Sequence, residues 1–259
     1  MVAILLLLSL FSINSAYAYY VDSFRLYYYI LAVGVLLYCV SRQFFGFSIL
    51  ALLLFIVSFF ILESSANIFN NVSYDSENKV SVLYGRKVTN KTKFIEHFQN
   101  RANFISVSGK RNEFVSIDRD FLKKGIVGLS PHYKADFMLS QLSDKGVMFI
   151  AVDFSGISLD EVEIVFNNLA QFVNLQGCPI VILGDFGIPV WTTPFKNFLD
   201  KTHLEVKNRI IWGGNKYFFN PFAVPTINVL GYKEMGLNKI KFLSKEAAEL
   251  SPILFDLSY

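Results

Sequence analysis

The feature that most constrains this chain is the scarcity of charge in its first 62 residues. Only three charged side chains occur there (Asp22, Arg25 and Arg42), although charged residues make up 17% of the whole sequence. Charged and polar side chains normally cover the surface of a soluble domain, and this stretch has too few of them. We therefore expect residues 1–62 to lie in a lipid bilayer and to hold a separate soluble domain beside it.

Three apolar segments account for this stretch. A helix needs about 20 apolar residues to cross the hydrocarbon core of a bilayer. Residues 2–21 and 44–62 reach that length, and residues 27–40 reach it if the tyrosines at 27–29 lie among the headgroups. The sequence predicts three transmembrane helices. None of the three spans contains Lys, Asp, Glu or His, which argues against a path for ions or protons through them.

The first segment has a second interpretation. Ala16-Tyr17-Ala18 is a small-x-small sequence of the kind cleaved after a signal peptide, which would remove residues 1–18. No Lys or Arg precedes the apolar run, however, and this favours an uncleaved helix. Sequencing the N-terminus of the mature protein distinguishes the two.

Orientation depends on the two links between the segments. Arg42 stands unopposed in the second link, whereas Arg25 in the first lies near Asp22. The positive-inside rule then places the second link and the N-terminus in the cytoplasm. After three crossings, the soluble domain would lie outside the cytoplasm of a bacterial inner membrane. We expect its partners to be the bilayer and other membrane proteins.

The overall charge and the cysteines exclude two classes. A net charge of +3 is small, and its Lys and Arg residues are dispersed, so nothing indicates a nucleic-acid surface. Cys39 lies in a predicted membrane segment and Cys178 in the soluble part, so the two cannot plausibly pair in a disulfide.

Residues 63–78 are polar and lack periodicity, which indicates a linker. Beyond it, short apolar runs alternate with helical patterns, which is typical of a layered α/β sandwich over residues 79–259. Helices are predicted at 90–100, at 159–175 and from Thr193 onward. Strands are predicted at 79–84, 103–107, 113–117, 125–129, 133–139, 146–153, 179–183, 209–212, 226–230, 239–243 and 252–257.

Two of the helices have start signals. Ser158 followed by Glu161 forms a capping box, and Gly177 is expected to end that helix. Its apolar stripe, which includes Val165 and Leu169, is expected to face the core. The next helix is expected to have Thr193 as its N-cap, with proline at the first helical position and Phe195, Phe198 and Leu199 facing inward.

Residues 179–186 read Pro-Ile-Val-Ile-Leu-Gly-Asp-Phe, and residues 191–195 read Trp-Thr-Thr-Pro-Phe. This arrangement resembles the Gly-Asp-Phe-Asn and Trp-Ser/Thr-x-x-Phe block of the endonuclease/exonuclease/phosphatase superfamily. It is most similar to bacterial members with three N-terminal membrane helices. The resemblance extends in order over residues 79–259. It implies a four-layer α-β-β-α sandwich preceded by three transmembrane helices.

Enzymes of this superfamily hydrolyse phosphoester bonds with Mg²⁺ or a similar ion. They use carboxylates to hold the metal, a histidine base, and Asn or His donors to the phosphoryl oxygens. The resemblance carries only one acidic group over unchanged, Asp185. The positions of the other functional groups are Gly85 for Asn, Gly109 for Glu, Asp153 for His, Gly187 for Asn, Asn228 and Val229 for Asp and His, and Leu250 for the final base.

The resemblance therefore implies a kept framework with lost chemistry. We predict no catalytic residue, no metal ligand and no cofactor, with Asp185 as a vestige of the family site. His97, His132 and His203 fall away from the family's positions and are expected to be surface or capping residues. The leading hypothesis is a membrane-anchored, non-catalytic protein of this superfamily that acts as a binding or scaffold subunit.

Two alternatives stay open. In the first, Asp153, Asp185 and Glu249 gather around Mg²⁺ in a rearranged site, and the chain is an active metal-dependent phosphodiesterase, phosphatase or nuclease. In the second, the resemblance is accidental, which predicts a strand order unlike that of a layered sandwich.

Overall fold

The computed structural model describes residues 25–43, 46, 48–49, 52–53, 56, 79–108, 113–117, 121–141, 146–208 and 225–258. The predicted helix at 2–21, the linker at 63–78 and the predicted strand at 209–212 lie outside these residues, as does most of the predicted helix at 44–62.

The second apolar segment is a helix, α3 (Arg25–Ser41), which is slightly longer at both ends than the predicted segment. Several of its large apolar side chains are exposed, including Leu37, Tyr38 and Val40. Where the structure describes the chain, no helix combines the length and apolar character needed to cross a bilayer.

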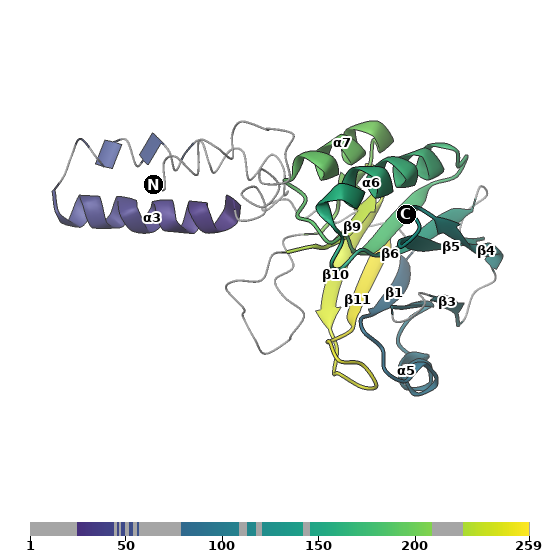
Figure 1. Ribbon diagram of the computed structural model, residues 1–259. Helices are drawn as coiled ribbons and strands as arrows, with labels where there is room; N and C mark the ends of the chain where they lie inside the picture. Colours follow the sequence, from purple (N-terminus) through teal and green to yellow (C-terminus); the bar gives the residue numbers. More distant parts are fainter. Residues whose placement is uncertain are drawn as a thin grey trace.

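The described residues from 79 onward contain two mixed β-sheets and three helices (Figure 1). The five-stranded sheet has the order β10-β11-β1-β2-β3, and the six-stranded sheet has the order β4-β5-β6-β7-β9-β8. Strands of the first sheet are β1 (Lys79–Gly85), β2 (Phe104–Val107), β3 (Glu113–Ser116), β10 (Gly236–Phe242) and β11 (Ile253–Ser258). Strands of the second are β4 (Phe121–Gly128), β5 (Lys134–Ser140), β6 (Val147–Asp153), β7 (Ile180–Asp185), β8 (Glu205–Val206) and β9 (Ile227–Gly231).

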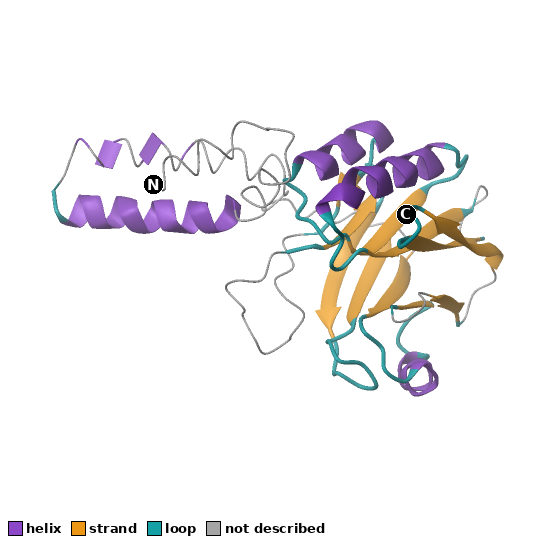
Figure 2. Cartoon of the chain, in the orientation of Figure 1, coloured by secondary structure: helices purple, strands orange, loops and turns teal. Residues whose placement is uncertain are grey.

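Helices cover the outer face of each sheet (Figure 2). Helices α6 (Leu159–Asn174) and α7 (Thr193–Thr202) lie side by side on the six-stranded sheet. Helix α5 (Lys91–Phe98) packs on the five-stranded sheet, where Phe94 and Phe98 meet Leu83 and Ile105. The expected layered α/β sandwich is therefore confirmed.

Besides the apolar layer under α5, two larger apolar layers fill the sandwich. The layer between α6/α7 and the six-stranded sheet contains alternate residues of β6 and β7, such as Ile150 and Ile182. The layer between the two sheets contains the opposite set, such as Phe149 and Leu183. Strands β6 and β7 are buried on both faces, which explains why each appears in the sequence as a continuous apolar run.

The helix ends correct three details of the sequence analysis. The N-cap of α7 is Thr192, one residue before the predicted Thr193. Ser158 is the N-cap of α6, but its side chain makes no cap hydrogen bond; its hydroxyl bonds the Glu161 carboxylate at 3.2 Å instead. Helix α6 ends with Leu175 as its C-cap, before the predicted Gly177, because its last turn is closed by backbone bonds of Leu175.

Candidate functional site

Strand alternation directs several polar side chains to one end of the layer between the sheets. In β6, Phe149 and Ala151 face this layer, so the next residue on the same side is Asp153. In β7, Leu183 faces the layer, so the residue that follows on the same side is Asp185. Parallel pairing sets Asp153 opposite Asp185. The structure therefore brings two of the three predicted carboxylates together at the carboxyl ends of adjacent strands.

Both carboxylates are held by donors of the protein itself. Ser108, at the end of β2 in the other sheet, donates its hydroxyl to Asp153 Oδ2. Asp153 Oδ1 accepts from the Ser155 hydroxyl at 2.7 Å and from the Ser155 backbone N–H at 3.2 Å. Asp185 Oδ1 accepts from the Gly187 N–H at 3.0 Å. Asp153 thus ties the two sheets together, and Asp185 fixes the turn that follows β7.

Tyr84 was missed in the sequence and completes this end of the site. Its ring is fully buried in the layer between the sheets. Its hydroxyl donates to Val152 O at 3.1 Å and accepts from the Asp185 N–H at 3.3 Å. Burial raises the pKa of Tyr84 well above its usual value, and the charges of Asp153 and Asp185 raise it further. Tyr84 therefore stays a neutral phenol that joins the two carboxylate-bearing strands.

Gly85 and Gly187, where the family resemblance would place Asn, are both closely surrounded by other atoms. A Cβ on Gly85 would lie 2.5 Å from the ring of Phe94, which fills the space beyond β1. A Cβ on Gly187 would lie 2.2 Å from the carbonyl oxygen of Phe154, and Gly187 has φ +71°. Neighbouring groups occupy the volume where an Asn would stand. At Gly187 the positive φ and the carbonyl contact both require glycine, whereas at Gly85 the obstacle is the Phe94 side chain.

Arg86, which directly follows β1, was also missed in the sequence. It is only 9% exposed, and its Nη1 is buried without a hydrogen-bond partner. The charges of Asp153 and Asp185 raise the pKa of Tyr84, and the charge of Arg86 lowers it. Arg86 is therefore a buried cation that acts on the Tyr84 hydroxyl, and it forms no ion pair with a described residue.

The remaining predicted positions do not join this group. Glu249 is exposed, and its backbone N–H bonds Lys87 O at 3.1 Å. Asn228 is buried in β9 with its Nδ2 unpartnered, and Gly109 lies outside the described residues. His97 and His132 are exposed, and His203 is the exposed C-cap of α7. Within the described ranges, no three His, Cys, Asp or Glu side chains gather closely enough to hold a metal ion.

The fold implies Mg²⁺, and the residues at this site do not fit it. Mg²⁺ needs carboxylate oxygens that are open to the ion and to its waters. Here both oxygens of Asp153 and one oxygen of Asp185 accept hydrogen bonds from protein donors.

A second acidic group missed in the sequence lies in the same layer. Asp136 of β5 alternates with Met138 and is 5% exposed, with its Oδ2 unpartnered. Burial, and then the charge of Glu113, raise its pKa to about 7, against a smaller lowering effect of Lys91. Ser106 of β2 faces the same layer with its Oγ buried and unpartnered. The layer between the sheets therefore contains buried polar atoms without hydrogen-bond partners beyond the end occupied by Asp153 and Asp185.

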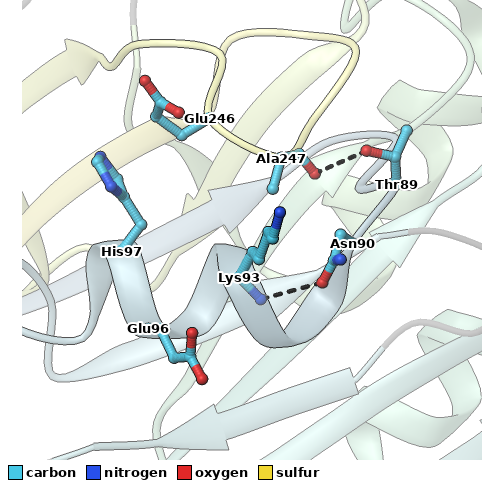
Figure 3. Close-up of a pocket in the computed structure, with 7 residues that line it drawn as sticks. All are labelled: Thr89, Asn90, Lys93, Glu96, His97, Glu246 and Ala247. Atoms are coloured by element: carbon cyan, nitrogen blue, oxygen red, sulfur yellow. Dashed lines mark hydrogen bonds between the residues drawn. The ribbon is translucent and has the colours of Figure 1, made fainter.

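A polar cleft of about 640 Å³ is lined by α5 and by residues on either side of it in the fold (Figure 3). One wall is α5, which directs Lys93 and His97 into the cleft, and the opposite wall carries Glu246. Ala247 O joins the walls, because it accepts from the Thr89 hydroxyl at 3.1 Å and from the Thr89 N–H at 3.0 Å. Ala247 has φ +54°, an unusual conformation for a residue other than glycine. Hydrogen bonds to Ala247 O therefore hold the two walls together, and the walls carry charges of both signs.

Comparison with known proteins supports the fold. No protein-family model and no curated protein sequence matches the chain. An endonuclease/exonuclease/phosphatase family protein from Bacteroides thetaiotaomicron is similar in structure, with a TM-score of 0.55 and 10% identity over 69% of this chain and 97% of the other. A mannosyl-6-phosphatase from the same organism has a TM-score of 0.52 and 9% identity, over 70% and 100% of the two chains. The catalytic domain of human Nocturnin has a TM-score of 0.52 and 8% identity, over 71% and 96%. The chain therefore has the endonuclease/exonuclease/phosphatase fold.

Proposed function

We propose that this chain is a membrane-anchored, non-catalytic protein with the endonuclease/exonuclease/phosphatase fold and that it serves as a binding or scaffold subunit. One observation carries the proposal: the positions that need chemical groups are filled by structural ones. Phe94 and the Phe154 carbonyl close the space at Gly85 and Gly187, and Ser108 and Ser155 engage the Asp153 carboxylate. Without a base and without donors, general acid–base catalysis worth about 10²–10⁴-fold is lost.

Hydrolysis assays test the absence of catalysis. The full-length chain, purified in mild detergent, is given bis(p-nitrophenyl) phosphate and p-nitrophenyl phosphate with Mg²⁺ or Mn²⁺. We expect no release of nitrophenol above the detergent blank, and no difference between wild type, Asp185→Ala and the exposed control Asp200→Ala. Turnover that Asp185→Ala abolishes and Asp200→Ala leaves intact would refute the proposal.

Restoring the family residues gives a second test. We expect Gly85→Asn and Gly187→Asn to lower the melting temperature without producing hydrolysis, because a Cβ at either site meets a neighbouring atom at 2.5 Å or less. Gly156→Asn is the matched control, since Gly156 also has positive φ (+79°) but no atom within 4 Å of its Cβ. A double variant that gains phosphodiesterase activity would show that the site was merely lacking ligands.

The alternative function is an active metal-dependent phosphohydrolase with a rearranged carboxylate site. The pairing of Asp153 with Asp185 favours it, whereas Glu249 is exposed and bonds Lys87 through its backbone. If it is correct, Glu249→Ala and Asp153→Ala each lower a measurable rate in the same assay.

Binding by the domain calls for a surface, and we expect the cleft between α5 and Glu246 to provide it. Lys93 and Glu246 form no ion pair with any described residue, so both charges are open to a polar partner. Photo-crosslinking from residue 93 in native membranes should give a defined adduct. Glu246→Lys should abolish it, and Lys239→Glu on the exposed face of β10 should leave it unchanged. An adduct insensitive to Glu246→Lys would exclude the cleft as the docking surface.

The membrane anchor is part of the proposal. The low charge of residues 1–62 supports an integral membrane protein with its C-terminal domain outside the cytoplasm. After alkaline carbonate washing, the chain should remain in the membrane fraction, and protease added to intact spheroplasts should cleave the C-terminal domain. Protection of that domain until the cells are lysed would reverse the orientation.

A further inference from the structure

Strand β4 is the outermost strand of the six-stranded sheet, so among the described residues it is paired along one edge only, with β5 (Figure 1). Alternate residues of such an edge strand direct N–H and C=O groups away from the sheet, where they can pair with another extended chain. Every residue of β4 is exposed or half-buried, so the described chain leaves this edge open. A further strand can therefore be added there.

The largest side chains of β4 form an exposed apolar strip. Phe121, Lys124 and Ile126 pair with alternate residues of β5 and therefore point to the same side of the sheet. The five-stranded sheet ends at β3, which contacts β5 across the interface, and β4 lies one strand further out. Phe121 is accordingly 45% exposed and Ile126 59%. Leu122, which has no partner on β5 at a shift of register, is exposed as well.

The other edge strands of the described chain lack such a strip. Strands β3 and β8 have only four and two residues. Strand β10 has seven residues and carries the exposed Lys239 and Lys241, but its apolar side chains are buried or half-buried. Short edges, and edges whose exposed side chains are charged, resist pairing with other chains. Strand β4 departs from this pattern, and contiguous exposed apolar residues of this kind mark an interaction site.

The charges of β4 favour an acidic partner. Lys123 and Lys124 are exposed, and neither forms an ion pair with a described residue. Their ammonium groups lie 5.8 Å from the centroid of the Phe137 ring and 5.7 Å from that of Phe121. Opposite charges on neighbouring strands attract, whereas antiparallel pairing of two β4 strands would bring the lysines of both copies together near the middle. An acidic segment therefore fits this edge better than a second copy of the chain.

A lipid surface fits the same edge less well. Exposed apolar side chains beside lysines can also contact anionic headgroups. An open sheet edge, however, carries backbone N–H and C=O groups, and these find no hydrogen-bond partners in hydrocarbon. A polypeptide segment supplies both the backbone groups and the acidic side chains that this edge can bind.

We propose that the outer edge of β4 binds an extended acidic segment of a partner protein as an additional strand. Backbone pairing supplies the affinity, and the two lysines and the apolar strip select the segment. This edge is a second binding surface, besides the cleft between α5 and Glu246. It does not depend on the absence of hydrolysis, so the inference can fail while the proposed function stands.

Peptide binding tests the role of the lysines. The probe is a short fluorescein-labelled peptide in which central glutamates are flanked by valine and threonine, and fluorescence anisotropy follows its binding to the full-length chain in mild detergent. We expect Lys123→Glu combined with Lys124→Glu to weaken binding about tenfold or more, because two attractions become repulsions. Lys239→Glu combined with Lys241→Glu, the matched change on the β10 edge, should leave the affinity unchanged.

Backbone methylation distinguishes strand addition from a contact of side chains alone. Two further peptides carry N-methyl groups on alternate residues, one at the odd and the other at the even positions, so that each lacks the donors of one edge. We expect only one of them to lose binding, since only one edge of an added strand faces β4. This comparison uses the wild-type chain, so it holds even if a variant fails to fold. Phe121→Ser combined with Ile126→Ser, which keeps the charges, should weaken the parent peptide.

Four results would overturn the inference. Equal binding of a peptide with lysines in place of the glutamates would show that charge does not select the partner. Full binding of both methylated peptides would exclude strand addition. Self-association of the chain that Ile126→Ser abolishes would assign the edge to a second copy. A bimane label on Ile126→Cys, with Cys39 and Cys178 replaced by serine, would assign it to the membrane if its emission shifts to the blue on transfer from detergent into lipid nanodiscs.

Discussion

The layer between the six-stranded sheet and helices α6 and α7 differs from the layer between the two sheets in its treatment of polar groups. The helix-side layer contains a continuous aromatic cluster. The centroid of the Phe166 ring lies 5.6–6.3 Å from the ring centroids of Phe154, Phe186, Phe195 and Phe198. The layer between the sheets begins as an apolar core and ends in charged groups.

The buried atoms without partners make the contrast sharper. Of the four such side-chain atoms among the described residues, two belong to Ser106 and Asp136, in strands that enclose the inter-sheet layer, and a third belongs to Arg86, which directly follows β1. Buried polar atoms normally have hydrogen-bond partners, and each one without a partner lowers stability. The helix-side layer is therefore apolar throughout, whereas the inter-sheet layer retains unpartnered polar atoms that lower the stability of the fold.

The largest effect is expected in the aromatic cluster. Phe166→Ala should lower the free energy of unfolding by about 3–5 kcal/mol, because it leaves a cavity among four rings. Urea unfolding in mild detergent, followed by the fluorescence of the buried Trp191, measures it. The control Phe121→Ala removes a ring that is 45% exposed and should change stability little. Equal effects of the two variants would break the comparison.

The next effect depends on pH and concerns Asp136. Its pKa is about 7 in the folded protein, against 3.8 as an ordinary value. Between these pH values the native state keeps a proton that the unfolded state has lost, so stability falls as pH rises from about 4 to about 7 and then levels off. Asp136→Asn lacks this fall. At pH 8 it should be more stable than wild type by on the order of 2–4 kcal/mol, and near pH 4 the advantage should vanish.

Urea unfolding at a series of pH values measures this difference. The control is Asp160→Asn, because Asp160 is an exposed residue of α6. The charges that face Asp136 are Glu113 on β3 and Lys91 on α5. A stability difference that does not change with pH would show that Asp136 is charged in the folded protein throughout, and that the inter-sheet layer accommodates it.

A smaller loss is expected when Tyr84 loses its hydroxyl. Tyr84→Phe removes the acceptor of the Asp185 N–H and the donor to Val152 O, and should cost about 1–3 kcal/mol. Tyr133→Phe is the control, since the Tyr133 ring packs on Phe154 and its hydroxyl makes no hydrogen bond with the described chain. Hydrogen exchange should speed up at Asp185 in the first variant only. An unchanged exchange rate at Asp185 would show that the Tyr84 hydroxyl does not link β6 to β7.

The smallest effect compares the helices that cover the two sheets. Asn90 Oδ1 accepts from the Lys93 N–H at 3.1 Å at the start of α5, so Asn90→Ala should cost about 1 kcal/mol. Ser158 makes no such bond at the start of α6, so Ser158→Ala should cost about half of that or less. The same urea unfolding measures both, and a larger loss at Ser158 would show that its bond to Glu161 is worth a true cap.

Much of the fold was readable in the sequence because its signals are local. The apolar runs at β6 and β7 predicted buried strands, and the stripe through Val165 and Leu169 predicted the inner face of α6. Boundaries shifted by one to four residues, as at Thr192, where the rigid ring of Pro194 fixes the first turn but leaves the neighbouring cap ambiguous. The site was only partly readable. Asp153 and Asp185 were identified, whereas Tyr84, Arg86 and Asp136 were not.

The sequence by itself determined the low charge of residues 1–62 and most of the order of strands and helices, and it predicted that acid, base and amide groups are missing where the resemblance would place them. Only the tertiary structure decided which groups surround Asp153 and Asp185. Ser108 reaches Asp153 across 45 positions of the chain, and Tyr84 reaches Asp185 across 101. Contacts of this kind depend on which strands are neighbours and on which sheet faces which, and no local periodicity encodes either. The contacts of Ser108 and Tyr84 with the two strands that carry Asp153 and Asp185 therefore become visible only when the two sheets are packed together.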